Sequence, residues 1–304
     1  MKKISLLISA MLMTFSASAQ MVNSENDNPD TLCMSQFTAI YEYRINTFDK
    51  DGKAVTDSCQ LVLQVGNGVW KTMIQGRLLH QEQRLDEIGE DRTECYRTEA
   101  TMHVETTTVG HPQGKTTAVF AIPPTVYEVE EDTEVPVWTI TEGLDSVCSF
   151  MCQKAKCEFR GKTWNVLFTE EVPTAAGPWK LHGLPGLIVS ATDGEGIHTF
   201  RLIGLKQEVL PITHVDGHYI LAQSPTTHRL TDTFVPYVKS TREQMLKHKK
   251  NIFGSSQYLT NPLFYMTGPL NKLELYGAND QRDTYESGVL VPDVRHKYQP
   301  LELK

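Results

Sequence analysis

The sequence predicts a mainly β, β-rich α+β fold, with one curved or sandwich-like antiparallel sheet and a few peripheral helices. Three observations support this class. Many short segments rich in β-branched and aromatic residues alternate between apolar and polar positions, which is typical of strands. Turn sequences containing Gly and Asn separate these segments at hairpin spacing. No internal repeat and no Pro/Gly/Ser-rich linker divides the chain, so we expect a single domain.

The strands are predicted largely from these turns. Gly66-Asn67-Gly68 should join two strands, because Asn and Gly tolerate the positive φ of tight hairpins. Further hairpins are expected at Gly110–Gly114, at Arg160-Gly161-Lys162 and at Asp193–Gly196. The expected strands are residues 37–45, 59–65, 69–74, 102–109, 116–122, 126–130, 135–140, 147–159, 163–169, 187–192 and 198–205.

Two helices are expected beside the sheet. Residues 77–92 carry apolar side chains at helical spacing with charges between them. Residues 240–253 begin with Ser240 and Glu243, which are spaced as a capping box. The following segment, 254–304, is rich in Gly, Pro, Asn and Tyr, and we expect irregular structure packed on the domain or partly disordered.

The first 19 residues have the organisation of a secretory signal peptide. Lys2 and Lys3 precede an apolar stretch, residues 4–15, and Ala17-Ser18-Ala19 provides a small-residue cleavage site. The apolar stretch is shorter than the roughly 20 residues of a membrane-spanning helix. We therefore expect cleavage after Ala19, a flexible leader over 20–32, a domain over 33–253, no transmembrane segment in the mature chain, and a periplasmic location.

Charge and cysteine content narrow the classes of partner and site. The net charge is −8, and loss of the two signal-peptide lysines makes it more negative, which disfavours nucleic acid as a partner. In an oxidising compartment disulfides are permitted. On one extended strand, Cys148 and Cys152 would face the same side about 13 Å apart, too far to bridge each other. Bridges to distant cysteines or buried thiols are therefore favoured over a zinc site. The connectivity stays open for the six cysteines: Cys33, Cys59, Cys95, Cys148, Cys152 and Cys157.

A series of short motifs between residues 147 and 206 resembles the GLPGLI family of exported bacterial proteins. In chain order they are Cys152-Gln153-Lys154-Ala155, Phe159-Arg160-Gly161-Lys162, Trp164, Thr169-Glu170-Glu171-Val172-Pro173, Gly177-Pro178-Trp179-Lys180 and the hexapeptide Gly183–Ile188. Two positions depart from the family pattern, because Lys162 replaces the usual Arg and Glu170 stands where Pro is common. The resemblance implies export and a β-rich domain, with no established activity, cofactor or catalytic residue.

The hexapeptide itself favours a structural interpretation. Gly183 and Gly186 allow backbone angles that other residues avoid, and Pro185 keeps Leu184 extended. We expect a tight bend that delivers a strand into the core. The alternative is a wall of a ligand groove, for which the candidate ligand-binding residues are Trp179, His182, Leu184, Pro185 and Trp164.

The sequence contains no recognisable nucleophile or phosphate-binding motif, and no catalytic residue, metal ligand or cofactor is assigned. The acidic run from Glu128 to Glu134 is interpreted as a solvated face. The preferred hypothesis is a non-catalytic envelope protein that binds a transport component, a peptide or a small apolar, lipid-like ligand. The alternative is a metal-dependent enzyme or metal carrier that uses Cys and His ligands, the candidate pairs being His214 with His218 and His182 with His198.

Overall fold

The structure is a computed structural model that describes residues 30–49, 51–75, 78, 104–122, 125–223, 230–254, 273–276, 282–285 and 297–304. The expected signal peptide and most of the expected leader lie outside these residues. So does the expected helix over 77–92, apart from Leu78. None of the helices within the described residues is long and apolar enough to cross a membrane.

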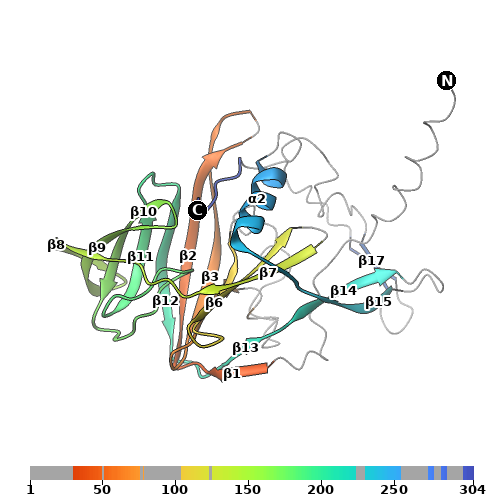
Figure 1. The fold of residues 1–304 in the computed structure, drawn as a ribbon, viewed down its shortest axis with the longest axis horizontal. Helices are drawn as coiled ribbons and strands as arrows, with labels where there is room; N and C mark the ends of the chain where they lie inside the picture. Colours follow the sequence, from red (N-terminus) through yellow and green to blue (C-terminus); the bar gives the residue numbers. More distant parts are fainter. Residues whose placement is uncertain are drawn as a thin grey trace.

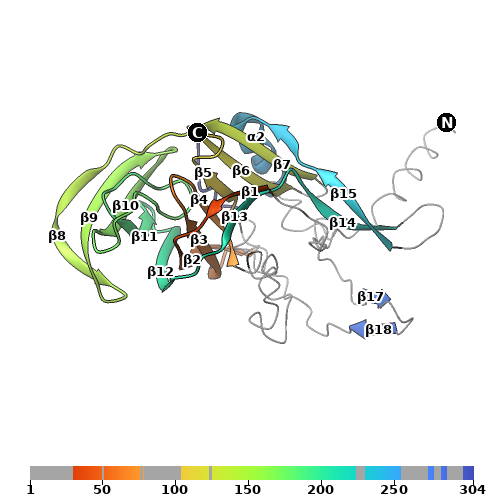
Figure 2. The same ribbon diagram turned by 90° about the horizontal axis from the view of Figure 1, so that it is seen from below.

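One twelve-stranded sheet dominates the fold and confirms the β-rich class (Figure 1). Neighbouring strands are antiparallel except for β16, which pairs parallel with β7. The sheet is strongly curved, as the view from below shows (Figure 2). Its spatial order is β16 (Val238–Ser240), β7 (Thr125–Asp132), β6 (Lys115–Ile122), β5 (Thr106–Val109), β4 (Trp70–Ile74), β3 (Ala54–Val65), β2 (Phe37–Phe48), β12 (His198–Lys206), β11 (Leu187–Asp193), β10 (Lys162–Thr169), β9 (Phe150–Phe159) and β8 (Thr139–Val147).

Three two-stranded sheets accompany the large one. They pair β1 (Asp30–Met34) with β13 (Pro211–His214), β14 (Gly217–Gln223) with β15 (Leu230–Pro236), and β17 (Leu273–Tyr276) with β18 (Arg282–Tyr285). Two expectations are thereby corrected. Strand β1 begins at Asp30, inside the expected leader, because pairing with β13 satisfies its backbone. Strands β17 and β18 lie within the segment expected to be irregular.

The predicted hairpins are confirmed where the turn residues are typical ones. Gly66–Gly68 joins β3 to β4, Gly110–Gly114 joins β5 to β6, and Gly194–Gly196 lies between β11 and β12. Two of the expected strands differ clearly from those in the structure. The expected strand 135–140 starts only at Thr139, because Pro136 has no N–H for a sheet. The expected strand 147–159 is two strands, since Cys148 and Ser149 form a turn with φ of 50° and 71°.

The turn at Cys148 also overturns the cysteine geometry expected for one continuous strand. Cys148 lies in the β8–β9 turn, whereas Cys152 and Cys157 lie on β9. The five described cysteines are free thiols, so the expected bridges among them are not formed in the structure; Cys95 lies outside the described residues.

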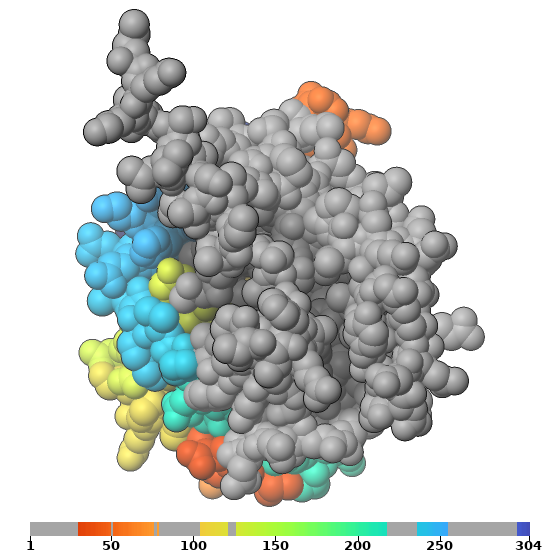
Figure 3. Space-filling view, turned by 90° about the vertical axis from the view of Figure 1, so that its right-hand side faces the viewer, coloured from red at the N-terminus to blue at the C-terminus, as the bar shows by residue number. Residues whose placement is uncertain are grey.

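Helix α2 (Arg242–Phe253) begins two residues later than predicted. Thr241 is its N-cap and forms the capping box with Gln244, in place of Ser240 and Glu243. Met245 and Phe253 pack against Phe120 and Val129 of the sheet. Figure 3 shows the blue segment that contains α2 beside the yellow segment that contains β7. The helix therefore covers the β6–β7 end of the sheet.

Candidate functional site

The hexapeptide Gly183–Ile188 forms the tight bend that the sequence predicts. Gly183 has a φ of 96°, and a Cβ on Gly186 would lie 2.0 Å from the backbone oxygen of Thr169. Leu187 and Ile188 are fully buried and open strand β11. Glycine is thus required at 183 for its backbone angle and at 186 for close backbone approach. The bend positions a core strand.

The segment before the hexapeptide lies inside the curve of the sheet. The Trp179 backbone N–H donates to Oγ1 of Thr72 (3.1 Å) on β4, and its carbonyl accepts from Oγ1 of Thr107 (3.2 Å) on β5. Its indole ring lies 5.7 Å from that of Trp164 on β10. Strands β5 and β10 are far apart in the sheet order, so one residue can contact both only from the concave side.

Four of the five candidate ligand-binding residues are closed to solvent. The exposed fraction is 0% for Trp164 and Trp179, 3% for Leu184 and 4% for His182, whereas Pro185 is exposed. The structure brings the two Trp rings together as neighbours in the hydrophobic core. Two depressions on the described surface lie elsewhere, one beside Cys59 and the other between β7 and α2.

Two buried histidines make stability depend on pH. Burial lowers the pKa of His182 to about 4, and burial together with the Lys162 charge lowers the pKa of His198 to about 4. The unfolded chain, with ordinary His pKa values near 6.5, binds these protons first. The stabilisation from neutral histidine is therefore complete above about pH 6.5 and is lost as the pH falls toward 4.

We expect the free energy of unfolding to fall by about 1 to 2 kcal/mol per histidine between pH 7 and pH 5. Urea titrations at both pH values measure this. His198→Gln should remove about half of the pH-dependent loss, because a glutamine cannot take up the proton. A loss of the same size in wild type and in His198→Gln would contradict the assignment.

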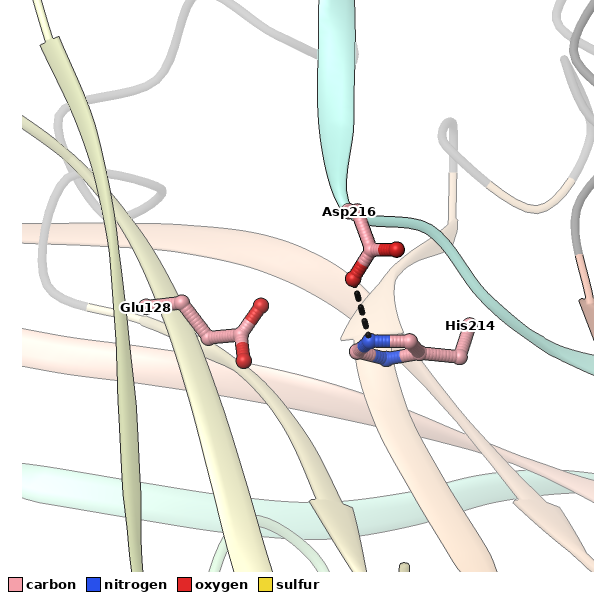
Figure 4. Close-up of side chains that lie close together, drawn as sticks. All are labelled: Glu128, His214 and Asp216. Atoms are coloured by element: carbon pink, nitrogen blue, oxygen red, sulfur yellow. Dashed lines mark ion pairs between the residues drawn. The ribbon is translucent and has the colours of Figure 1, made fainter. Parts of the chain in front are cut away.

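A separate cluster of possible metal ligands lies at the other end of the sheet. Glu128 on β7, His214 at the end of β13 and Asp216 just before β14 each offer one ligand atom, and these atoms lie within 4.8 Å of one another. Figure 4 shows the Glu128 carboxylate facing His214 and Asp216. Nε2 of His214 lies 3.3 Å from Oδ1 of Asp216.

The carboxylate of Glu128 is the unusual member of this cluster. Glu128 is only 2% exposed. Its Oε1 accepts from Nζ of Lys239 (2.5 Å), which lies opposite Glu128 in the parallel β16–β7 pair. Its Oε2 is buried and has no hydrogen-bond partner. A buried, unpaired carboxylate oxygen costs about 1 to 3 kcal/mol, and a cation placed beside it would offset that cost.

The donor set suits a divalent transition-metal ion. Three ligand atoms that are each about 2.1 Å from one ion lie at most about 4.2 Å from one another. Side-chain movements of less than about 1 Å would therefore bring the ligand atoms of Glu128, His214 and Asp216 to bonding distance of one ion. Imidazole nitrogen with carboxylate oxygens suits Zn²⁺ or Mn²⁺, whereas Ca²⁺ prefers oxygen alone. The ring of His111 lies 5.5 Å from that of His214.

The sequence identified only part of this cluster. His214 was a candidate, but its described neighbours are Glu128 and Asp216; the side chain of His218 lies outside the described residues. The cluster includes neither His182 nor His198. The acidic run containing Glu128 was interpreted as solvated, and this is wrong for Glu128. Strand alternation offered a signal, because Glu128 is two residues from the buried Val126.

No protein-family model and no curated protein matches the sequence. Among solved structures, the chain is similar to PNGF-II in two crystal forms, P21 and C2. The TM-score is 0.40 for both, with 11% and 12% sequence identity. The matches cover 69% and 70% of this chain but 33% and 32% of PNGF-II, so the chain spans about a third of that protein's length. This similarity is too low to transfer either fold or function.

Proposed function

We propose that the chain is an exported, non-catalytic member of the GLPGLI family that binds a divalent transition-metal ion in the cell envelope. The observation that carries the proposal is the buried, unpartnered Oε2 of Glu128 beside His214 and Asp216. Export and family rest on the signal-peptide pattern and on the motifs between residues 147 and 206.

The local charge balance supports a cation here. Lys239 reaches Glu128 from an exposed position and engages only Oε1. A metal ion bound through Oε2 can therefore coexist with Lys239. Because His214 and Asp216 flank a short bend between β13 and β14, the two ligands are held by one turn while Glu128 is fixed in the sheet.

The test is metal binding by the mature full chain purified without an affinity tag. We expect about one Zn²⁺ or Mn²⁺ per chain by calorimetry and by elemental analysis, with Ca²⁺ binding at least tenfold weaker. Glu128→Gln and His214→Ala should each weaken the binding of the transition metal at least tenfold, because each removes one of three protein ligands.

Two variants control for charge and for the loss of an imidazole. Glu142→Gln removes an exposed carboxylate on β8, and His248→Ala removes an exposed imidazole on α2. Both should bind metal as wild type does. Equal weakening in all four variants, or no stoichiometric binding by the wild-type chain, would reject the proposal.

A further inference from the structure

The 297–304 segment lies against the large sheet in the manner of a bound peptide. Its Lys297 N–H donates to the Phe48 carbonyl (2.7 Å), and the Lys297 carbonyl accepts from Oγ1 of Thr47 (2.7 Å). Farther along, the Leu303 N–H donates to the Arg160 carbonyl (2.8 Å). The contacts therefore come from the ends of β2 and β9, which are separated in the sheet by β12, β11 and β10.

Two side chains of this segment are inserted into the domain. Leu301 is 5% exposed and joins the main hydrophobic core, while Glu302 is 3% exposed. The next residue, Leu303, is 59% exposed. Main-chain hydrogen bonds combined with a few inserted side chains are the usual way in which proteins hold an extended peptide.

The pocket for Glu302 is built by two of the sequence motifs that the metal site leaves unexplained. Nζ of Lys180, from Gly177–Lys180, lies 3.1 Å from Oε1 of Glu302. Nη1 of Arg160, from Phe159–Lys162, lies 3.9 Å from its Oε2. Both cationic side chains are only 3–4% exposed. Buried charges are retained where they are paired, so these motifs provide a pocket for a carboxylate.

The neighbouring buried charges are balanced when Glu302 carries its negative charge. The other carboxylates are Glu105, which pairs with Lys249 and Lys180, and Glu131, which pairs with Arg160 and Lys180. Arg242 and Glu134 add one further cation and anion at the more exposed rim. With Glu302 removed, the three buried cations Lys180, Arg160 and Lys249 would face only two buried or nearly buried carboxylates.

Gly161, the glycine of the Phe159–Lys162 motif, also fits a site that holds the 297–304 segment. Gly161 has a φ of 83°, and a Cβ there would lie 2.9 Å from Cβ of Leu303. A side chain at this turn would therefore collide with the segment. The turn is shaped to let a peptide backbone pass closely over it.

We propose that Arg160, Gly161 and Lys180 form a binding site for an extended peptide carrying a Leu-Glu pair, and that the 297–304 segment occupies it in cis. The tethered segment keeps the site closed to peptides of the same chemistry.

The experiment uses the full chain with a specific protease site introduced between Tyr285 and Lys297. After cleavage, a fluorescent peptide with the sequence of residues 297–304 should exchange into the site with a micromolar Kd, measured by anisotropy. The uncut chain should bind this peptide at least tenfold more weakly, because a tethered competitor acts at an effective concentration of roughly millimolar. A peptide carrying Glu302→Gln should also bind at least tenfold more weakly.

A second variant covers the case in which the cut chain unfolds. The uncut double variant Leu301→Ala/Glu302→Gln has a weakened tethered segment and should bind the labelled peptide at least tenfold more tightly than the wild-type chain. Equal binding by the double variant and wild type, or equal affinity for the Glu and Gln peptides, overturns the proposal.

Discussion

Replacing Lys180 by methionine should lower the free energy of unfolding by about 3 to 5 kcal/mol, since loss of one member of a buried ion cluster leaves its partners uncompensated. Nζ of Lys180 lies 3.0 Å from Glu131, 3.1 Å from Glu302 and 3.8 Å from Glu105. Burial alone would lower the pKa of Lys180, but these carboxylates outweigh it and raise the pKa. Lys180 is therefore charged in the folded protein at neutral pH.

Urea or thermal unfolding of Lys180→Met measures the loss directly. Lys247→Met is the matched control, because Lys247 is exposed on α2 and its replacement should change stability by less than about 0.5 kcal/mol. In Lys180→Met/Glu302→Gln the destabilisation should be smaller than the sum of the two single changes, since the pair is coupled. A Lys180→Met variant within about 1 kcal/mol of wild type would show that the cluster is solvated.

This ion cluster marks the limit of what the sequence predicts. Local turn chemistry is visible in the sequence, so the hairpins at Gly66–Gly68 and Gly194–Gly196 could be predicted. The turn at Cys148-Ser149 could not, because neither residue favours positive φ. The pairing of Lys180 with Glu302 joins residues 122 positions apart, and no periodicity carries such a contact.

The metal-binding cluster could likewise be predicted from the sequence only in part. The bend between β13 and β14 contains Asp216 and is followed by Gly217, which are both typical turn residues, and it places Asp216 beside His214. The third ligand, Glu128, lies on β7, far from His214 and Asp216 in the sequence. It reaches them only because of the position of β7 beside β16 in the sheet. Sequence alone can indicate the residue types of such a site, but the ligand set depends on strand order.

The motif residues show most clearly why a family resemblance does not define a site. Trp179 and Trp164 were candidates for the wall of a ligand groove, and Arg160 and Lys180 belonged only to the motifs. In the structure the two tryptophans are fully buried, and the two cations hold Glu302. The positions with the strongest pattern in the sequence thus serve packing, while the charged positions between them provide the contact with the 297–304 segment.

Trp179→Ala should lower the free energy of unfolding by about 3 to 5 kcal/mol, because it leaves a large cavity in the core. The Trp179 ring is 0% exposed and packs 6.0 Å from the ring of Phe159 and 5.7 Å from that of Trp164. Trp179→Phe should cost less, because phenylalanine fills part of the space.

Chemical unfolding of wild type, Trp179→Phe and Trp179→Ala tests whether stability falls in that order, with Val137→Ala as control. Val137 is 85% exposed, and its truncation should change stability by less than about 0.5 kcal/mol. If Trp179 instead formed the wall of an open ligand site, Trp179→Ala would keep its stability within about 1 kcal/mol of wild type. The stability loss therefore decides between a tryptophan that holds the concave side of the sheet together and one that is available to a ligand.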